Sequence, residues 1–341
     1  RANIAGQGAV ENNLPYNAPH FAYADNGRPH AVWFLDAITF YNQKREAELR
    51  QTGGIALWRL GLEDPEIWET FRCGKECRPE QFAHVRSRAV ISEIGEGDFI
   101  TARTERSDGE RLVSLNADGS WHTKYLRYPQ YPLLYHQGQS DPHRVALTFD
   151  DGPDPDWTPQ VLDILREKDV KAAFFVTGAN AASNPALMRR IFAEGHEIGN
   201  HTYSHANLAG ISAPRLQLEL NATQRVIESL TSRSTTLFRP PYNADRHPQS
   251  LAEFVPLAAA QQLGYLPVSE SIDTEDWRLS PPQVLLKRVR ERRGEGNIVL
   301  LHDGGGDRSQ TVAALPLIID YLQKRGDRIV SLSALLGVPA N

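Results

Sequence analysis

Four polar side chains in the second half of the chain could hold a divalent metal ion and activate water beside it. Asp150 and Asp151 are adjacent and follow an apolar run, and His201 and His205 are four residues apart. Two neighbouring carboxylates are expensive to bury without a cation. The histidine spacing predicts that both imidazoles face the same way on one helical turn, a common arrangement of metal ligands. Two imidazoles and one carboxylate leave positions open for water and substrate, which is typical of catalytic zinc sites.

A fifth side chain, His302, follows the apolar run at 298–301. An imidazole there could transfer a proton near neutral pH, and Asp273 or Asp276 could hold its ring in one tautomer. Arg239 could pair with a carboxylate of the same centre or form a structural ion pair. These residues predict that the metal ion is accompanied by proton-transferring groups.

Each feature has a plainer interpretation when taken alone. An isolated pair of histidines at this spacing is more often found on the surface or at a helix cap. The sequence from Asp150 to Pro153 favours a simple turn. His302 could be a satisfied core side chain. The position of these residues in the fold decides between the interpretations.

The elements that must position these side chains alternate between strand and helix patterns. We expect strands at 144–149, 172–176, 196–199, 236–238, 266–271, 298–301 and 328–332. Strands alternating with helices imply an α/β fold with a parallel sheet, here closed or nearly closed into a barrel. Every polar cluster comes directly after one of these strands. The carboxyl ends of barrel strands meet at one face, where active sites are built, so we expect one shared centre.

The first 140 residues show a different pattern. A strand pattern at 31–35, a helical pattern at 36–51 with Asp36 as N-cap, and a strand pattern at 55–60 predict a βαβ unit. Further on, Asp108-Gly109 and Asp118-Gly119 predict hairpin turns. A cluster of Tyr, Pro and Gln at 128–139 indicates a linker. We therefore expect an N-terminal segment at 1–85, a small β-rich connector at 86–140 and the barrel at 141–341.

Composition narrows the function classes. Of the 341 residues, 40% are hydrophobic and 23% charged, as in an ordinary globular protein. The net charge of −5 predicts no attraction to nucleic acid or anionic lipid. We find no apolar stretch of the roughly 20 residues that a membrane helix needs and no secretory signal. Because the sequence opens on Arg1, we expect a processed or excised piece.

Cys73 and Cys77 could be free thiols or one local disulfide, since a zinc site with His84 would have unusual spacing.

Five short motifs resemble, in order, those of the polysaccharide deacetylases of the NodB-homology type, carbohydrate esterase family 4. The resemblance covers roughly the last three-fifths of the chain, and no core motif position departs from it. The motifs read Thr148-Phe149-Asp150-Asp151-Gly152-Pro153, His201-Thr202-Tyr203-Ser204-His205, Arg239-Pro240-Pro241-Tyr242, Asp273-Thr274-Glu275-Asp276-Trp277 and Leu300-Leu301-His302-Asp303.

The resemblance implies a distorted (β/α) barrel with one divalent metal ion, usually Zn²⁺, although Co²⁺, Mn²⁺ and Ni²⁺ stay open. Asp151, His201 and His205 would hold the ion. Asp150 would be the general base and His302 the general acid.

Five further residues receive supporting roles from the same resemblance. Arg239 would orient the base, and Asp276 would steer the acid. The backbone N–H of Tyr242 would stabilise the oxyanion. Trp277 and Leu300 would line the pocket for the acetyl methyl group.

The activity implied is the hydrolysis of N-acetyl groups from an N-acetylglucosamine-containing glycan, whether chitin-like, peptidoglycan or exopolysaccharide, with release of acetate. O-deacetylation of acetylated xylan and a carbohydrate-binding scaffold with a vestigial site stay open as alternatives. By resemblance we expect an extracytoplasmic location. We also expect a monomer with a glycan as partner, no nucleic acid, and no membrane insertion of this piece, while a membrane-tethered parent protein stays open.

The N-terminal part resembles the last strands of a glycoside hydrolase family 18 barrel, through residues 32–37 and 55–61. The acidic D-x-x-D-x-D-x-E motif of that family is missing, so this part could not act as a chitinase. The combination is similar to large bacterial proteins in which such a domain precedes a deacetylase and a membrane-embedded family 2 glycosyltransferase follows. A docking role for residues 1–135 also stays open.

Overall fold

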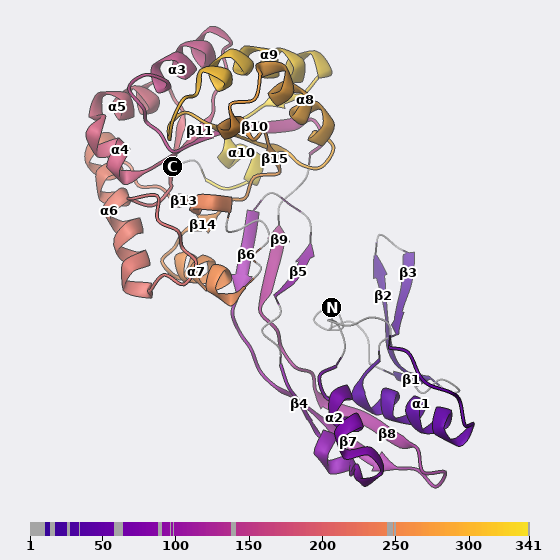
Figure 1. Cartoon of the computed structure of the whole chain (residues 1–341). Coiled ribbons are helices and arrows are strands. Elements are labelled where there is room, and N and C mark those ends of the chain that lie inside the picture. Colours follow the sequence, from indigo (N-terminus) through magenta and orange to yellow (C-terminus); the bar gives the residue numbers. More distant parts are fainter. Residues whose placement is uncertain are drawn as a thin grey trace. The chain divides into compact units, whose positions relative to one another are not determined.

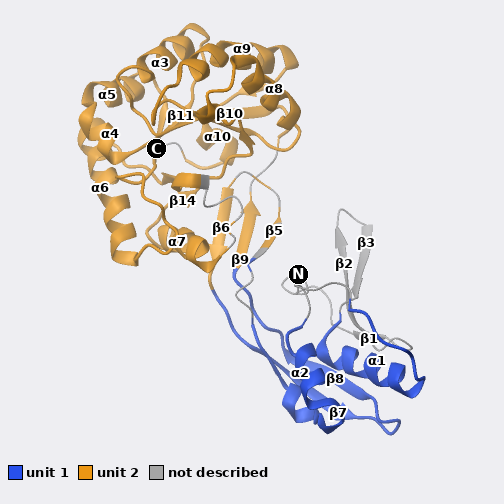
Figure 2. Cartoon of the chain, viewed as in Figure 1, with its two compact units in different colours: residues 1–92, 105–132 blue, residues 93–104, 133–341 orange. Residues whose placement is uncertain are grey.

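The computed structural model describes residues 11–13, 18–25, 28–33, 35–57, 64–87, 91–95, 97, 99–137, 141–243, 248 and 250–339. The chain forms two compact units (Figure 2). Unit 1 comprises Arg1–Ser92 and Glu105–Pro132, and unit 2 comprises Glu93–Thr104 and Leu133–Asn341. The β-rich stretch at 86–140 is therefore divided between both units.

Unit 2 is built on a parallel sheet, which confirms the expected distorted barrel. The strands lie in the order β14-β13-β12-β11-β10-β16-β15, and β17 pairs with the beginning of β10. Most of their side chains are apolar and buried, as expected where helices cover a parallel sheet. The bounds are β10 (Arg144–Asp150), β11 (Ala173–Val176), β12 (Glu197–Asn200), β13 (Leu237–Phe238), β14 (Leu266–Pro267), β15 (Ile272–Asp273), β16 (Ile298–His302) and β17 (Arg328–Ile329).

Helices surround this sheet (Figure 1). The largest apolar cluster joins alternate residues of β10, Val145, Leu147 and Phe149, to helix residues such as Leu165 and Leu315. Burying one such side chain contributes about 1.5–3 kcal/mol, so this packing holds the strand ends in place. The helices are α3 (Thr158–Glu167), α4 (Gly178–Ser183), α5 (Pro185–Ala193), α6 (Ala213–Thr231), α7 (Leu251–Gln262), α8 (Pro282–Arg292), α9 (Ser309–Arg325) and α10 (Leu332–Leu336).

Two predicted strands of the barrel are wrong in their extent. The strand expected at 328–332 ends at Ile329, and Leu332 already begins helix α10. Residues 266–271 were expected to form a single strand, but β14 ends at Pro267 and a separate strand, β15, begins at Ile272. A proline lacks the N–H group that would continue a strand ladder. Asp273 lies within β15 rather than after a strand, where it pairs in register with Leu300 of β16.

A small antiparallel sheet also belongs to unit 2. Its strands β5 (Ser92–Gly95), β9 (Leu133–Gln137) and β6 (Phe99–Arg103) lie in that order, so the predicted linker at 128–139 contains a strand. The Gln261 side chain of α7 binds one edge of the β6 backbone, accepting from Ala102 N at 2.7 Å and donating to Ile100 O at 3.2 Å. These bonds fix the small sheet to α7.

Unit 1 contains two antiparallel sheets and two α-helices in its described residues. The first sheet holds β1 (Glu11–Asn13), β2 (Ala18–Asp25) and β3 (Arg28–Trp33), and the second holds β4 (His84–Val85), β7 (Gly109–Leu115) and β8 (Trp121–Arg127). Helix α1 (Ala37–Leu49) begins after Asp36, whose carboxylate accepts from Thr39 N as predicted. Helix α2 (Ile67–Cys73) packs beside it.

The structure differs from several sequence expectations for this region. The strand before α1 pairs antiparallel with β2, and residues 55–57 form no strand, while 58–60 lie outside the described residues. The expected βαβ unit is therefore not found in the described part of unit 1. Asp118-Gly119 does join the β7–β8 hairpin. Asp108-Gly109 forms no hairpin, because β6 pairs with β9 and β7 with β8.

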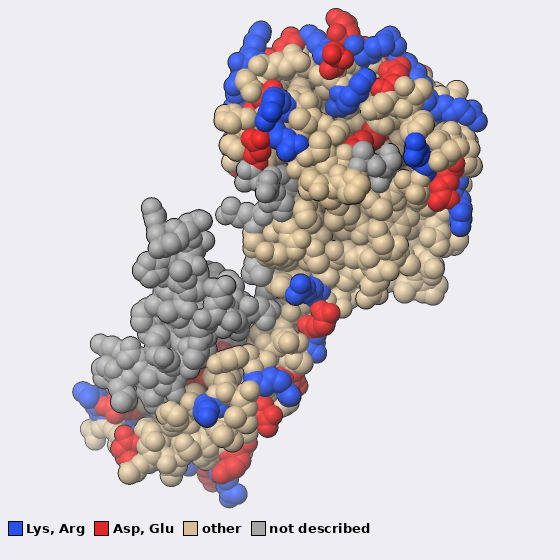
Figure 3. Space-filling view, turned by 180° about the vertical axis from the view of Figure 1, so that it is seen from behind, with Lys and Arg blue, Asp and Glu red and all other residues tan. Residues whose placement is uncertain are grey.

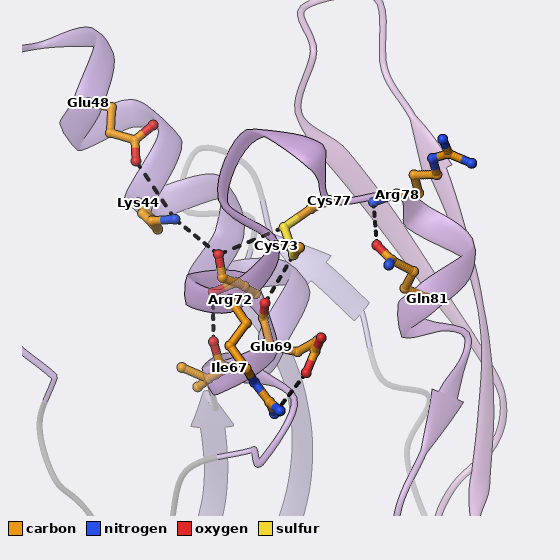
Figure 4. The surroundings of a disulfide bond; sticks show 10 residues. Lys44, Glu48, Ile67, Glu69, Arg72, Cys73, Cys77, Arg78 and Gln81 are labelled. Atoms are coloured by element: carbon orange, nitrogen blue, oxygen red, sulfur yellow. Dashed lines mark hydrogen bonds and ion pairs between the residues drawn. A yellow bond between two sulfur atoms is a disulfide. The ribbon is translucent and has the colours of Figure 1, made fainter.

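Cys73 and Cys77 form one disulfide bond, which confirms the local pairing among the alternatives (Figure 4). Among the described residues, no helix is both long and apolar enough to span a membrane. On the face that Figure 3 presents, basic and acidic side chains are intermingled over the outer part of unit 2.

Candidate active site

The five predicted centre residues meet at the carboxyl ends of neighbouring strands. Asp150 is the last residue of β10 and pairs in register with His302, the last residue of β16. His201 directly follows β12, and Arg239 follows β13. The predicted gathering of polar clusters at one face of the sheet is therefore present in the structure.

Asp151, His201 and His205, the three residues expected to hold a metal ion, lie close enough together to do so. One ligand atom from each lies within 4.8 Å of the others. The Oδ1 atom of Asp151 is 3.4 Å from His201 Nε2 and 3.1 Å from His205 Nε2. This oxygen is buried and has no hydrogen-bond partner. A buried acceptor without a partner facing two imidazole nitrogens fits a divalent cation between the three residues.

The backbone around the two histidines differs from the prediction. Residues 201–208 form a loop rather than a helical turn, and Thr202 and His205 have left-handed φ angles of 66° and 54°. Non-glycine residues rarely adopt this region, so the surrounding contacts must hold it. The two imidazoles converge because of this loop conformation and not because of helical periodicity.

Charge and hydrogen bonding leave two of these three candidate ligands, Asp151 and His201, in a form that could bind a metal ion. Burial works against ionisation of Asp151, but the nearby imidazoles of His201 and His205 outweigh it and lower its pKa. A metal ligand must be deprotonated, so this carboxylate is already in the required form. His201 Nδ1 lies 2.7 Å from the Arg239 carbonyl oxygen, which can only accept. Nδ1 therefore carries the hydrogen, and Nε2 is left to bind a metal ion.

Asp150 is buried and held by Arg239. The Nη1 atom of Arg239 donates to Asp150 Oδ1 and to Thr148 Oγ1, each at 2.8 Å. The Arg239 guanidinium is fully buried and lies 4.2 Å from the ring centre of Phe175. Because the cation is fixed on several sides, it orients one carboxylate oxygen and leaves the other, Oδ2, 3.9 Å from His201 Nε2.

His302 is held by Asp276 through two contacts. Its Nδ1 lies 2.7 Å from Asp276 Oδ1, and its backbone N–H donates to Asp276 Oδ2. Thr311 Oγ1 also donates to Asp276 Oδ2, at 2.7 Å. Burial lowers the pKa of His302, but the charge and hydrogen bond of Asp276, followed by the charges of Asp151 and Asp150, raise it to about 9. These contacts favour the protonated form of the imidazole.

The three remaining predicted residues occupy different environments. Tyr242 is exposed, with a left-handed φ of 63°, and its ring packs against His205. Trp277 is 49% exposed, with the guanidinium of Arg278 4.6 Å from its ring centre. Leu300 is buried two residues before His302 on β16, so both side chains point to the same face of the sheet.

The structure adds three polar residues to which the sequence reasoning assigned no role. Asp303 and Glu219 are buried, and Asn180 is partly buried. Asn180 Nδ2 donates to the Asp151 carbonyl at 2.7 Å. Asp303 accepts from Thr158 Oγ1 at 2.6 Å, and burial raises the pKa of Asp303 to about 7. Glu219 accepts from the backbone between the two histidines. Of these three residues, only Glu219 had a signal in the sequence, because it is a carboxylate beside Leu220 on the apolar stripe of a helix.

Comparison with known proteins identifies the class. The model of the family described as polysaccharide deacetylase matches residues 137–268. A peptidoglycan-N-acetylglucosamine deacetylase of Bacillus cereus is 42% identical over 196 residues, which cover 56% of this chain and 87% of the relative. The chain therefore belongs to the polysaccharide deacetylase family, a family of hydrolases.

Two more relatives agree with this assignment. A chitooligosaccharide deacetylase of Azorhizobium caulinodans is 34% identical and shares 53% of this chain and 89% of its own length. The crystal structure of the Bc1960 peptidoglycan N-acetylglucosamine deacetylase matches with a TM-score of 0.55 and 34% identity, and the match covers 60% of this chain and 92% of that one.

Proposed function

We propose that this protein hydrolyses N-acetyl groups of an N-acetylglucosamine-containing glycan and that the reaction depends on a divalent metal ion. The observation that carries the proposal is the position of the Asp151–His201–His205 group beside a carboxylate and a protonated imidazole. The family relationship and the names of the relatives, which act on peptidoglycan and chitooligosaccharides, support the same substrate class. Such polymers lie outside the cytoplasm, so we propose an extracytoplasmic site of action.

Asp151, His201 and His205 would hold the ion, and Zn²⁺ suits this ligand set, with Co²⁺, Mn²⁺ or Ni²⁺ as alternatives. When bound, the ion would supply Lewis acidity that polarises the acetyl carbonyl and lowers the pKa of a nearby water molecule.

The protein's own groups would move the protons. Asp150, oriented by Arg239, would accept a proton as water adds to the acetyl carbon. His302 would donate the proton on Nε2 to the glucosamine nitrogen, because its Nδ1 is engaged by Asp276. The carbon–nitrogen bond then breaks, and acetate and the free amine leave.

Three residues would shape the space for the acetyl group. The backbone N–H of Tyr242 would donate to the oxyanion as charge develops on the acetyl oxygen. Leu300 and Trp277 would offer apolar contact to the methyl group. The buried position of Leu300 on the face that carries His302 supports this assignment.

The test is acetate release from N-acetylated chitin oligomers, peptidoglycan and acetylated xylan, before and after treatment with a chelator. We expect release from an N-acetylated substrate, loss after chelation and recovery when Zn²⁺ is added back. Release from xylan alone would contradict the N-acetyl assignment, and release that survives chelation would contradict the metal dependence. A metal-loaded protein that releases no acetate would favour a binding scaffold.

A further inference from the structure

Glu219 is a buried carboxylate that reaches from a helix to the loop between the two histidines. It lies on α6 with 2% of its surface exposed. Its Oε2 accepts from the backbone N–H groups of Tyr203 and Ser204 at 2.9 and 2.8 Å. Its Oε1 accepts from Ser204 Oγ at 2.8 Å and from Arg215 at 2.6 Å. Three of these four bonds go to the loop.

The loop that receives these bonds has an unfavourable backbone. Thr202 and His205 both adopt left-handed φ angles, and the loop has no helical hydrogen bonds of its own to maintain them. Its carbonyl groups are bound from the other side, because Gly178 N and Ala179 N of α4 donate to Thr202 O and Tyr203 O. Helices α4 and α6 are neighbours in unit 2 (Figure 1). The peptide groups of the loop are thus clamped between α4 and Glu219.

The helix itself gains little from this side chain. Glu219 lies beside Leu216 and Leu220, on a stripe that is otherwise suited to apolar packing. Burial alone would raise the pKa of Glu219, but hydrogen bonds from Ser204 and Tyr203 and the contact with Arg215 outweigh it and lower the pKa. A buried anion is costly unless its acceptors are satisfied, and here the loop satisfies most of them.

From this geometry we infer that Glu219 is a positioning residue that preorganises His201 and His205 for metal binding. It touches neither imidazole and acts through the backbone of the loop. The inference rests on the proposed metal site. Residues that orient metal ligands from outside typically change metal affinity by about 10–100-fold when they are removed.

The test measures the Zn²⁺ dissociation constant of the whole chain by competition with a coloured chelator, together with the melting temperature with and without Zn²⁺. For Glu219→Ala we expect affinity weaker by about 10-fold or more, and a smaller rise in melting temperature on adding Zn²⁺. Glu219→Gln should lie between this variant and the wild type, because its carbonyl oxygen can still accept from both backbone N–H groups. If Glu219→Ala fails to fold, the Gln variant carries the test.

Two matched controls separate positioning from simple destabilisation. Asp327→Asn alters another buried carboxylate of unit 2, which pairs with Arg293, and should lower the melting temperature without changing Zn²⁺ affinity. Arg215→Ala removes a partner whose side chain is 55% exposed and should leave the affinity within about 3-fold.

The outcomes discriminate between the two proposals. Wild-type Zn²⁺ affinity in every Glu219 variant that folds would overturn the inference and leave the proposed function intact. A wild-type protein that does not bind Zn²⁺ would overturn the proposed metal site and the inference with it.

Discussion

Asp150 and His302 are register partners on the neighbouring parallel strands β10 and β16, and each is the last residue of its strand. Register partners on parallel strands point to the same face of the sheet. The proposed base and the proposed acid are therefore brought together by backbone pairing. Side-chain contacts then set their orientation, with Arg239 against Asp150 and Asp276 against His302.

Asp150→Asn and His302→Ala should each lower turnover by roughly 10²–10⁴-fold, because each removes one proton-transferring group. Neither residue belongs to the ligand group, so both variants should still bind about one metal ion per chain. Acetate release measured beside metal content and circular dichroism checks this. Near-normal release by either variant would mean that its role belongs to another residue.

Asp276→Asn should move the alkaline limb of the activity profile to lower pH. A general acid works only while protonated, and Asp276 supplies the largest contribution that raises the pKa of His302 to about 9. The same shift stabilises the folded protein below pH 6.5, and this contribution is lost as the pH rises from 6.5 to about 9. Measuring kcat/KM across a pH series for the wild type and the Asp276→Asn variant checks this prediction. An unchanged alkaline limb would show that Asp276 does not set the pKa of His302.

Arg239→Met should destabilise the fold by about 3–5 kcal/mol, because it leaves the Asp150 carboxylate buried without its cation. Adding Asp150→Asn to this variant should recover part of the loss, since the unpaired charge is then gone. Urea unfolding of the two single variants and the double variant measures the coupling. Strictly additive losses would show that the pair contributes nothing to stability as a pair.

Gly152→Ala should destabilise the turn after β10, because a Cβ atom there would lie 2.4 Å from both carboxylate oxygens of Asp303. We expect a loss of about 1–3 kcal/mol as Asp303 or the turn is displaced. Gly294→Ala is the matched control, since nothing lies within 4 Å of its added Cβ. Thermal unfolding compares them, and equal stability of both variants would refute the close packing.

Sequence patterns identified the centre because its chemistry is local. The segments that become β10, β12, β13 and β16 each end in, or are followed at once by, polar residues of the centre. In a parallel sheet this order alone places those residues at one end. The sequence pattern gave wrong strand bounds and a wrong strand pairing where the structure depends on which strands pair with each other. Pro267 ends a strand early, and β3 pairs with β2 rather than forming a βαβ unit with a later strand.

The sequence by itself determined the α/β barrel and the family, and it proposed the residues of the centre, because periodicity and motif order are properties of neighbouring residues. Only the tertiary structure decided how the centre is held. The conformation of the loop carrying His201 and His205, the Arg239–Asp150 pair and the reach of Glu219 to Tyr203 all depend on contacts between distant segments. Such contacts arise from packing, which leaves little periodic trace in the chain.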